Sequence, residues 1–205
     1  MATLLNFRND SRRLLNLVND TEQITDTELT EWANKCLRNL IAWLELDLST
    51  DTQTTVSGTK EYTISTDFLK ITDVYYNNKK LWQVDEDWLS ARDRSWQDDN
   101  NNVPDYFFMS ARNKIKLHPT PNEAKTLDIR IIPVPTSLSD PDDSPSTLPT
   151  IYHDCFQWFM TSMAKYKLND PINGDRYFQR YLQLRVDLRS GGGQVSEERS
   201  QFYWT

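Results

Sequence analysis

Apolar and polar residues follow two different periods along this chain, and the change of period divides it into segments. Over residues 25–48, apolar side chains recur every three or four positions, a spacing that predicts an amphipathic helix. Thr25 and Glu28 have capping-box spacing, so each side chain can bind a free backbone N–H of the first turn. A stripe this long and rich in bulky residues needs other helices to bury it.

The helical period also occurs at both ends of the chain. Residues 3–19 predict a first helix, and the period returns at Leu148-Pro149, where Pro suits a first helical position. Asn169-Asp170-Pro171 breaks the third helix, and a fourth is expected over residues 171–190. These helices can supply partners for the stripe of residues 25–48.

From residue 50 the period becomes two, which predicts strands. Three hairpins are expected, with these segments paired: 54–57 with 61–65 around Gly58, 69–76 with 79–84 around Asn77-Asn78, and 106–109 with 114–117. Residues 85–91 predict a short helix and 127–134 a last strand. Residues 137–147 are rich in Pro, Ser and Asp, a composition typical of a linker.

The predicted fold is therefore α+β. Two helices from each end form an antiparallel four-helix bundle, and a β-rich insertion, a small sheet or barrel-like, separates helices two and three. The expected limits are 1–50 and 148–190 for the bundle, 51–147 for the insertion, and 191–205 for an extended C-terminal arm.

Composition narrows the class of protein. The chain has 205 residues with 38% hydrophobic and 12% aromatic side chains, enough to build a core. A net charge of −7 argues against a surface that grips nucleic acid everywhere. No signal peptide or run of 18 apolar residues is present, so we expect a soluble protein without a membrane anchor. Cys36 and Cys155 lie on apolar stripes and predict two buried free thiols.

Motifs for catalysis are absent from the sequence. Only Gly58 and Gly174 lie outside the triple-glycine run, which excludes the common glycine-rich phosphate loops. His118 and His153 lack neighbours at metal-ligand spacing. We therefore expect no enzyme activity, catalytic residue, cofactor or metal. A hydrolase with a dispersed site stays an alternative, because catalytic triads need not be local in sequence.

Two features suggest interaction chemistry. The fourth helix carries Arg176, Arg180, Arg185 and Arg189, two pairs at i, i+4 spacing. They form either a solvated basic face or a surface for an acidic partner subunit or DNA phosphates.

The second feature is the C-terminal arm, which ends in Phe202, Tyr203 and Trp204. Docked in a partner's groove, these aromatics would be large anchors. Packing back onto the same subunit and plain disorder are the alternatives.

The layout resembles the head–tail adaptor proteins of tailed bacteriophages, particularly the ring proteins below the portal in short-tailed phages. Four segments carry the resemblance over nearly the whole chain: ELTEWANKCLRNL for the second helix, KEYTISTDFLKITDVYYNNKKL for a strand pair, VPDYFFMSARNKIKLHPTP for a P-x-Y…I-x-L-x-P-x-P hairpin, and SPSTLPTIYHDCFQWFMTSMAKYK for the Leu-Pro start and third helix.

The resemblance implies a structural role in the virion neck, after assembly in the host cytoplasm. It implies a homomeric ring, twelve-fold in the best-known relatives, that binds the portal and a tail or nozzle protein. It also implies a channel through which genomic DNA passes without sequence-specific binding, and an arm that clasps the portal. On this interpretation Trp43, off the main stripe, is expected to touch a neighbouring subunit. A head-completion stopper or a tail-tube or tail-terminator component is the alternative.

Overall fold

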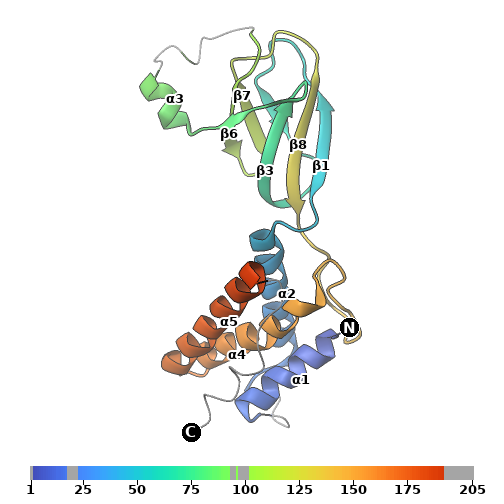
Figure 1. Cartoon of the computed structure of the whole chain (residues 1–205), viewed down its shortest axis with the longest axis vertical. Helices are drawn as coiled ribbons and strands as arrows, with labels where there is room; N and C mark the ends of the chain where they lie inside the picture. The colour runs from blue at the N-terminus through green and yellow to red at the C-terminus, as the bar shows by residue number, and fades with distance from the viewer. Residues whose placement is uncertain (1, 18–22, 93–95, 97–101, 192–205) are drawn as a thin grey trace. The chain divides into compact units, whose positions relative to one another are not determined.

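The structure is a computed structural model that describes residues 2–17, 23–92, 96 and 102–191. Its contacts divide the chain into two compact units. Residues 1–46 and 135–205 form a helical unit, and residues 47–134 form a strand-rich unit (Figure 1).

The helical unit contains four α-helices and a short 3-10 helix among its described residues. Their bounds are α1 Leu4–Leu15, α2 Asp26–Leu44, η1 Thr150–Tyr152, α4 Asp154–Lys167 and α5 Pro171–Gly191. The capping box predicted for α2 is confirmed: the Glu28 N–H donates to Thr25 Oγ1 at 3.3 Å and the Thr25 N–H to Glu28 Oε2 at 3.0 Å. Two helices end earlier than predicted, because Asn16 and Glu45 adopt the left-handed conformation that stops a helix.

Helix α4 is the centre of the helical unit, because α1, α2 and α5 all pack against it. The Phe7 ring of α1 stacks on Phe156 of α4 with centroids 4.3 Å apart. Trp32 and Cys36 of α2 are buried, as the stripe predicts. The close approach of α5 depends on Gly174, because an added Cβ would lie 2.8 Å from the Tyr166 ring of α4. The Gly174 carbonyl also accepts a 2.9 Å hydrogen bond from Ser162 Oγ.

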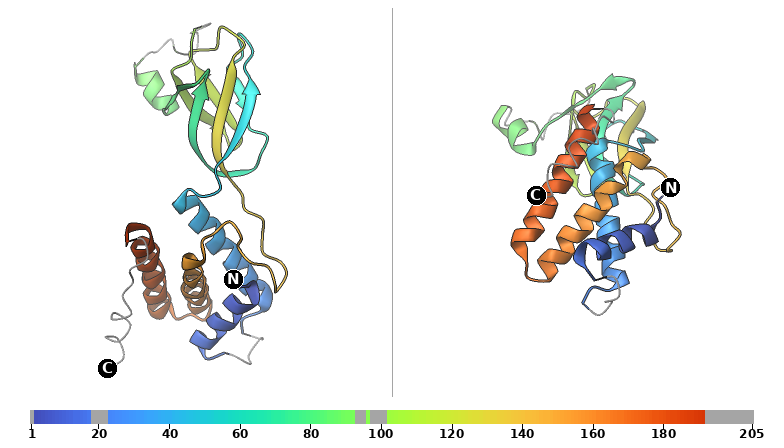
Figure 2. Two further views of the ribbon diagram at one scale, coloured as in Figure 1. Left: turned by 45° about the vertical axis from the view of Figure 1, so that its right-hand side comes forward. Right: turned by 60° about the horizontal axis from the view of Figure 1, so that its bottom comes forward.

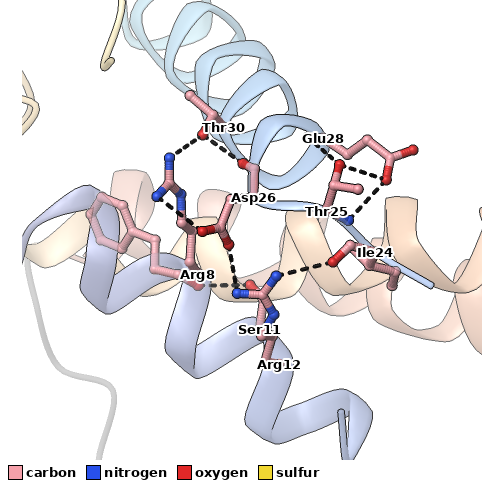
Figure 3. Close-up of polar contacts among 9 residues, drawn as sticks. Arg8, Ser11, Arg12, Ile24, Thr25, Asp26, Glu28 and Thr30 are labelled. Atoms are coloured by element: carbon pink, nitrogen blue, oxygen red, sulfur yellow. Dashed lines mark hydrogen bonds and ion pairs between the residues drawn. The ribbon is translucent and has the colours of Figure 1, made fainter. Parts of the chain in front are cut away.

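Two buried arginines orient α1 against the first turn of α2 (Figure 3). Arg12 donates to Asp26 Oδ1 at 2.6 Å and to the Ile24 carbonyl at 3.0 Å. Arg8 donates to Thr30 Oγ1 at 2.5 Å and its Nη1 lies 3.7 Å from Asp26 Oδ2. Figure 2 (right) shows α1 running across α2 rather than alongside it.

The predicted antiparallel four-helix bundle with a β-rich insertion between helices two and three was wrong. The described residues form five α-helices and two four-stranded sheets, and α1 crosses α2. Periodicity shows which face of a helix is buried but not the angle at which a partner covers it. In the observed crossed packing, Arg8 and Arg12 of α1 reach Asp26 at the start of α2.

Residues 137–147 do not form the free linker that their composition indicates. Leu138 is buried, and Asn34 of α2 binds both its backbone groups, accepting from its N–H at 2.7 Å and donating to its carbonyl at 2.9 Å. The Pro141 and Asp143 carbonyls accept hydrogen bonds from the first N–H groups of α1. This segment therefore joins α1 to α2.

The strand-rich unit contains two sheets and helix α3. The bounds are β1 Ser49–Thr54, β2 Glu61–Thr63, β3 Phe68–Tyr76, β4 Lys79–Lys80, β5 Trp82–Gln83, α3 Glu86–Arg92, β6 Tyr106–Ala111, β7 Lys114–His118 and β8 Thr126–Pro133. One sheet has the order β1-β8-β3-β4 and the other β2-β7-β6-β5. Both contribute to one apolar cluster, with Val74, Ile129 and Ile131 from the first and Tyr62, Phe107 and Ile115 from the second.

The hairpin predictions had mixed outcomes. The β6–β7 hairpin is confirmed, and β3 pairs with β4 through Tyr75 and Tyr76, joined by Asn77 and Asn78, both with positive φ. The hairpin around Gly58 was wrong, since β1 pairs with β8 and β2 with β7. The predicted strand 79–84 is divided, since β4 pairs with β3 whereas β5 pairs with β6 in the other sheet. Among the described strands, the chain passes between the two sheets at the β1–β2, β2–β3, β4–β5 and β7–β8 connections.

Candidate interaction surfaces

The four arginines of α5 lie in two different environments. Arg185 and Arg189 turn toward α2, where their guanidinium carbons lie 4.5 Å and 4.9 Å from the centroid of the Trp43 ring. Arg185 also donates to Asn39 Oδ1 at 2.8 Å, and Arg189 donates to the Trp43 carbonyl at 3.4 Å. These contacts hold α5 on α2, so half of the predicted basic face is used inside the subunit.

Trp43 is half-buried beneath these two guanidinium groups. Such cation–π contacts are worth about 0.5–2 kcal/mol each. The cluster continues to Tyr181, whose hydroxyl donates to Asn39 Oδ1 at 2.6 Å. Burial raises the pKa of Tyr181. The contact of Trp43 with a neighbouring subunit stays a prediction, since one of its faces already packs within the chain.

Arg176 and Arg180 remain exposed on the first half of α5, where the Arg180 guanidinium carbon lies 5.6 Å from the Trp158 centroid of α4. Together with Ile172, which is 82% exposed, they occupy positions i, i+4 and i+8, so the three side chains follow one line along the helix. No carboxylate forms an ion pair with either arginine in the part of the chain that the structure describes. We call Ile172, Arg176 and Arg180 the α5 row.

The aromatic residues Phe202, Tyr203 and Trp204 lie outside the described residues, so the docking of the arm stays a prediction.

The strand-rich unit has a second candidate surface, which sequence reasoning missed. Trp82 is 70% exposed and pairs with Tyr106 in the parallel β5–β6 ladder, so both side chains project from the same face of the sheet. The Trp88 ring of α3 packs on Tyr106 with centroids 5.4 Å apart, and Arg92 lies 5.3 Å from the Trp88 centroid. Figure 1 shows α3 beside β6. This surface, the α3 patch, consists of Trp82, Asp85, Glu86, Asp87, Trp88, Arg92 and Tyr106.

The α3 patch is acidic as well as aromatic. Asp85, Glu86 and Asp87 are exposed, and among the described residues no cation forms an ion pair with any of them. Beneath the patch, Leu89, Trp96 and Phe108 form a small buried cluster, which supports α3 from below. Three consecutive carboxylates between Trp82 and Trp88 could have indicated this surface. The strand and helix periods, however, predict which positions are buried and not which exposed residues gather on one surface.

The two cysteines are buried and free, as predicted. Desolvation raises the pKa of both thiols, that of Cys155 to about 12, so neither has the depressed pKa of a nucleophilic cysteine. His153 packs against Phe7 with centroids 5.7 Å apart, and burial lowers its pKa. His118 packs against Trp96 and Tyr106. Both histidines therefore lie in aromatic packing.

One shallow depression of about 320 Å³ lies on the strand-rich unit. Its lining residues are Tyr76, Asn77, Lys79, Val103, Asn122, Glu123 and Lys125. Lys125 pairs with Glu123 at 2.9 Å and Lys79 with Asp105. The hydrogen bond to Glu123 raises the pKa of Lys125, so this lysine is a poor general base for the hydrolase alternative. None of the described helices is long and apolar enough to cross a membrane.

Comparison with known proteins identifies the family. No curated protein matches the chain. A family model described as the SU10 adaptor protein matches residues 2–201, and this confirms the resemblance to phage head–tail adaptors. Because the match covers nearly the whole chain, this protein belongs to the SU10 adaptor protein family and is a phage adaptor with a structural role.

Proposed function

We propose that copies of this chain form a ring that joins the portal of the phage head to the tail. The match to the SU10 adaptor protein family over residues 2–201 is the observation that carries this proposal. An adaptor has to bind at least two other proteins, and the exposed α3 patch and α5 row supply surfaces for such contacts. The ring is a non-enzymatic part of the virion neck, with twelve copies expected from the resemblance.

The proposed ring surrounds a channel for the genome. DNA has to slide through such a channel without being held, and a net charge of −7 suits that requirement because phosphates bind tightly to cationic surfaces. Arg185 and Arg189 are engaged with Trp43. Arg176 and Arg180 are exposed and can meet another molecule, although Arg180 also lies 5.6 Å from the Trp158 centroid.

The C-terminal arm, residues 191–205, is proposed to clasp the portal. Phe202, Tyr203 and Trp204 would enter a groove of the portal and supply large buried anchors, the residue types that dominate binding energy at interfaces. The opposite side of the ring would contact the tail or nozzle protein. Copies assemble in the host cytoplasm and remain in the mature virion.

Binding to purified portal rings tests this proposal. Sedimentation of the full-length chain with portal rings is expected to give a complex of defined stoichiometry. Deleting residues 202–205 should leave the circular dichroism spectrum unchanged and weaken binding at least about tenfold, since one such anchor is worth about 2 kcal/mol or more. Normal binding after the deletion would refute the arm assignment alone. Binding of the full-length chain to tail rings and never to the portal would favour a stopper or tail component.

A further inference from the structure

The two candidate surfaces are complementary in charge, and each also exposes a large apolar side chain. The α3 patch presents three carboxylates against one guanidinium, beside the exposed indole of Trp82. The α5 row presents two guanidinium groups and the apolar side chain of Ile172. The α3 patch therefore has a net negative charge, and the α5 row has a net positive charge.

We propose that the α3 patch of one copy contacts the α5 row of the next copy in the ring. This contact rests on the proposed function, because the ring is its premise. Arg176 and Arg180 would pair with carboxylates of the patch, and Arg176 would stack on the Trp82 indole, because Arg180 already lies over Trp158 in its own chain. Ile172 would cover the remaining aromatic surface.

The chain itself uses the same chemistry in its internal contacts. Arg92 lies over Trp88 at 5.3 Å, Arg180 over Trp158 at 5.6 Å and Arg185 over Trp43 at 4.5 Å. Arginine is also the cation best suited to interfaces, since its planar group can stack on an aromatic face while it donates to a carboxylate. An exposed tryptophan flanked by acids is therefore a fitting receptor for a second copy's arginines.

The opposite face of the strand-rich unit lacks these properties. Several charged and polar groups there already have partners within the β1-β8-β3-β4 sheet: Lys80 pairs with Asp73, Arg130 lies 4.6 Å from the Tyr75 centroid, and Thr52 donates to Asp128 at 2.7 Å. A face whose charges are paired internally gains little from a partner. The α3 patch is thus the favoured contact surface of this unit.

The complementarity also predicts the symmetry of the contact. Two α3 patches placed together would oppose like charges, as would two α5 rows, and such juxtaposition is unfavourable. Each copy therefore offers one surface to the copy before it and the other to the copy after it. A repeated head-to-tail contact of this kind closes into a ring when the rotation allows.

Charge reversal on each surface gives a direct test. R176E/R180E makes the row acidic, and E86R/D87R makes the patch basic. Assembly is measured by native mass spectrometry and sedimentation, with the chain alone and on portal rings. Each variant alone should assemble only at a concentration at least tenfold higher than the unaltered chain. An equimolar mixture should assemble normally, because every contact then joins opposite charges. W82A, at a surface position, should weaken assembly in the same way.

The control R13E/K35E changes the net charge by the same amount as R176E/R180E, at exposed sites outside both surfaces, and it should assemble like the unaltered chain. Circular dichroism checks that each variant is folded. Normal assembly of both R176E/R180E and W82A would overturn the proposed contact. Failure of the mixture to assemble, together with normal assembly of W82A, would also overturn it. Neither result would contradict the ring itself. Rings that form normally but fail to bind the tail would show that the patch meets the tail protein instead. An unaltered chain that never assembles, even on portal rings, would overturn the ring and the contact together.

Discussion

Replacing Asp26 with asparagine is expected to destabilise the helical unit far more than a surface change of the same kind. The Asp26 carboxylate faces two arginines whose side chains are only 10% and 8% exposed (Figure 3). Asparagine keeps the shape and one acceptor oxygen but removes the negative charge. Two guanidinium groups would then lie in a poorly hydrated site without a counter-charge.

The size of the expected loss of stability depends on how exposed Asp26 and its two arginine partners are. Removing one partner of a fully buried ion pair costs about 3–5 kcal/mol, whereas an exposed pair contributes about 0–1 kcal/mol. Asp26 itself is 56% exposed, so solvent screens part of the loss. Its position in the first turn of α2 adds about 0.3–1 kcal/mol through the helix dipole. We therefore expect the free energy of unfolding of this unit to fall by about 2 kcal/mol.

Urea unfolding followed by far-ultraviolet circular dichroism measures this change, because the helices dominate that signal. The matched control is D10N, since Asp10 pairs with Arg13 at 2.9 Å on the surface of α1, the helix that carries Arg8 and Arg12. R12M combined with D26N should cost less than the sum of the single changes, because it removes one of the uncompensated charges. A loss for D26N no larger than that for D10N would refute the account of how α1 is held.

Three further predictions concern packing and titration. G174A should lower the free energy of unfolding by about 1–3 kcal/mol and so lower the melting temperature. The added Cβ would lie 2.8 Å from two carbons of the Tyr166 ring. Combining G174A with Y166L should recover most of the loss. Hydrogen bonds from the Lys167 side chain and the Thr25 backbone lower the pKa of Glu28 below its ordinary value of 4.5, so its contribution to stability is present above that value and is lost as the pH falls through the lower folded pKa. E28Q should therefore flatten the loss of stability in acid, and an unchanged acid slope would contradict this. Burial raises the pKa of Cys155 to about 12, so a thiol reagent at about pH 8 should modify it only after unfolding.

Elements that depend on neighbouring residues could be predicted from the sequence. The start of α2 follows from the spacing of Thr25 and Glu28, and the turn at Asn77 and Asn78 follows from two residues that tolerate positive φ. The break before α5 follows from Asn169-Asp170-Pro171, where Asn169 is left-handed. In each case the residues that indicate the feature lie within four positions of the cap, turn or helix break that they predict.

Pairings between distant segments could not be predicted. Ser49 is the partner of Ile131, and no local pattern distinguishes that pairing from a hairpin around Gly58. The glycine has positive φ and permits a turn, but the strands on either side join different sheets. Apolar residues of both strand sets bury more surface between two sheets than one isolated hairpin could.

The interaction surfaces were predictable only in part. The i, i+4 spacing of the arginines indicates one helix face, but it does not show that Arg185 and Arg189 meet Trp43 while Arg176 stays exposed. That difference depends on where α5 crosses α2. Likewise, the exposure of Trp82 depends on its pairing with Tyr106 and on the position of α3, which the strand pattern does not specify.

Single-particle electron microscopy of the chain mixed with the portal of its phage tests the central claim most directly. The account predicts a closed ring of copies on the tail-facing side of the portal, around an open channel. Portal rings that carry no copies of the chain, at concentrations where the chain is folded, would contradict it.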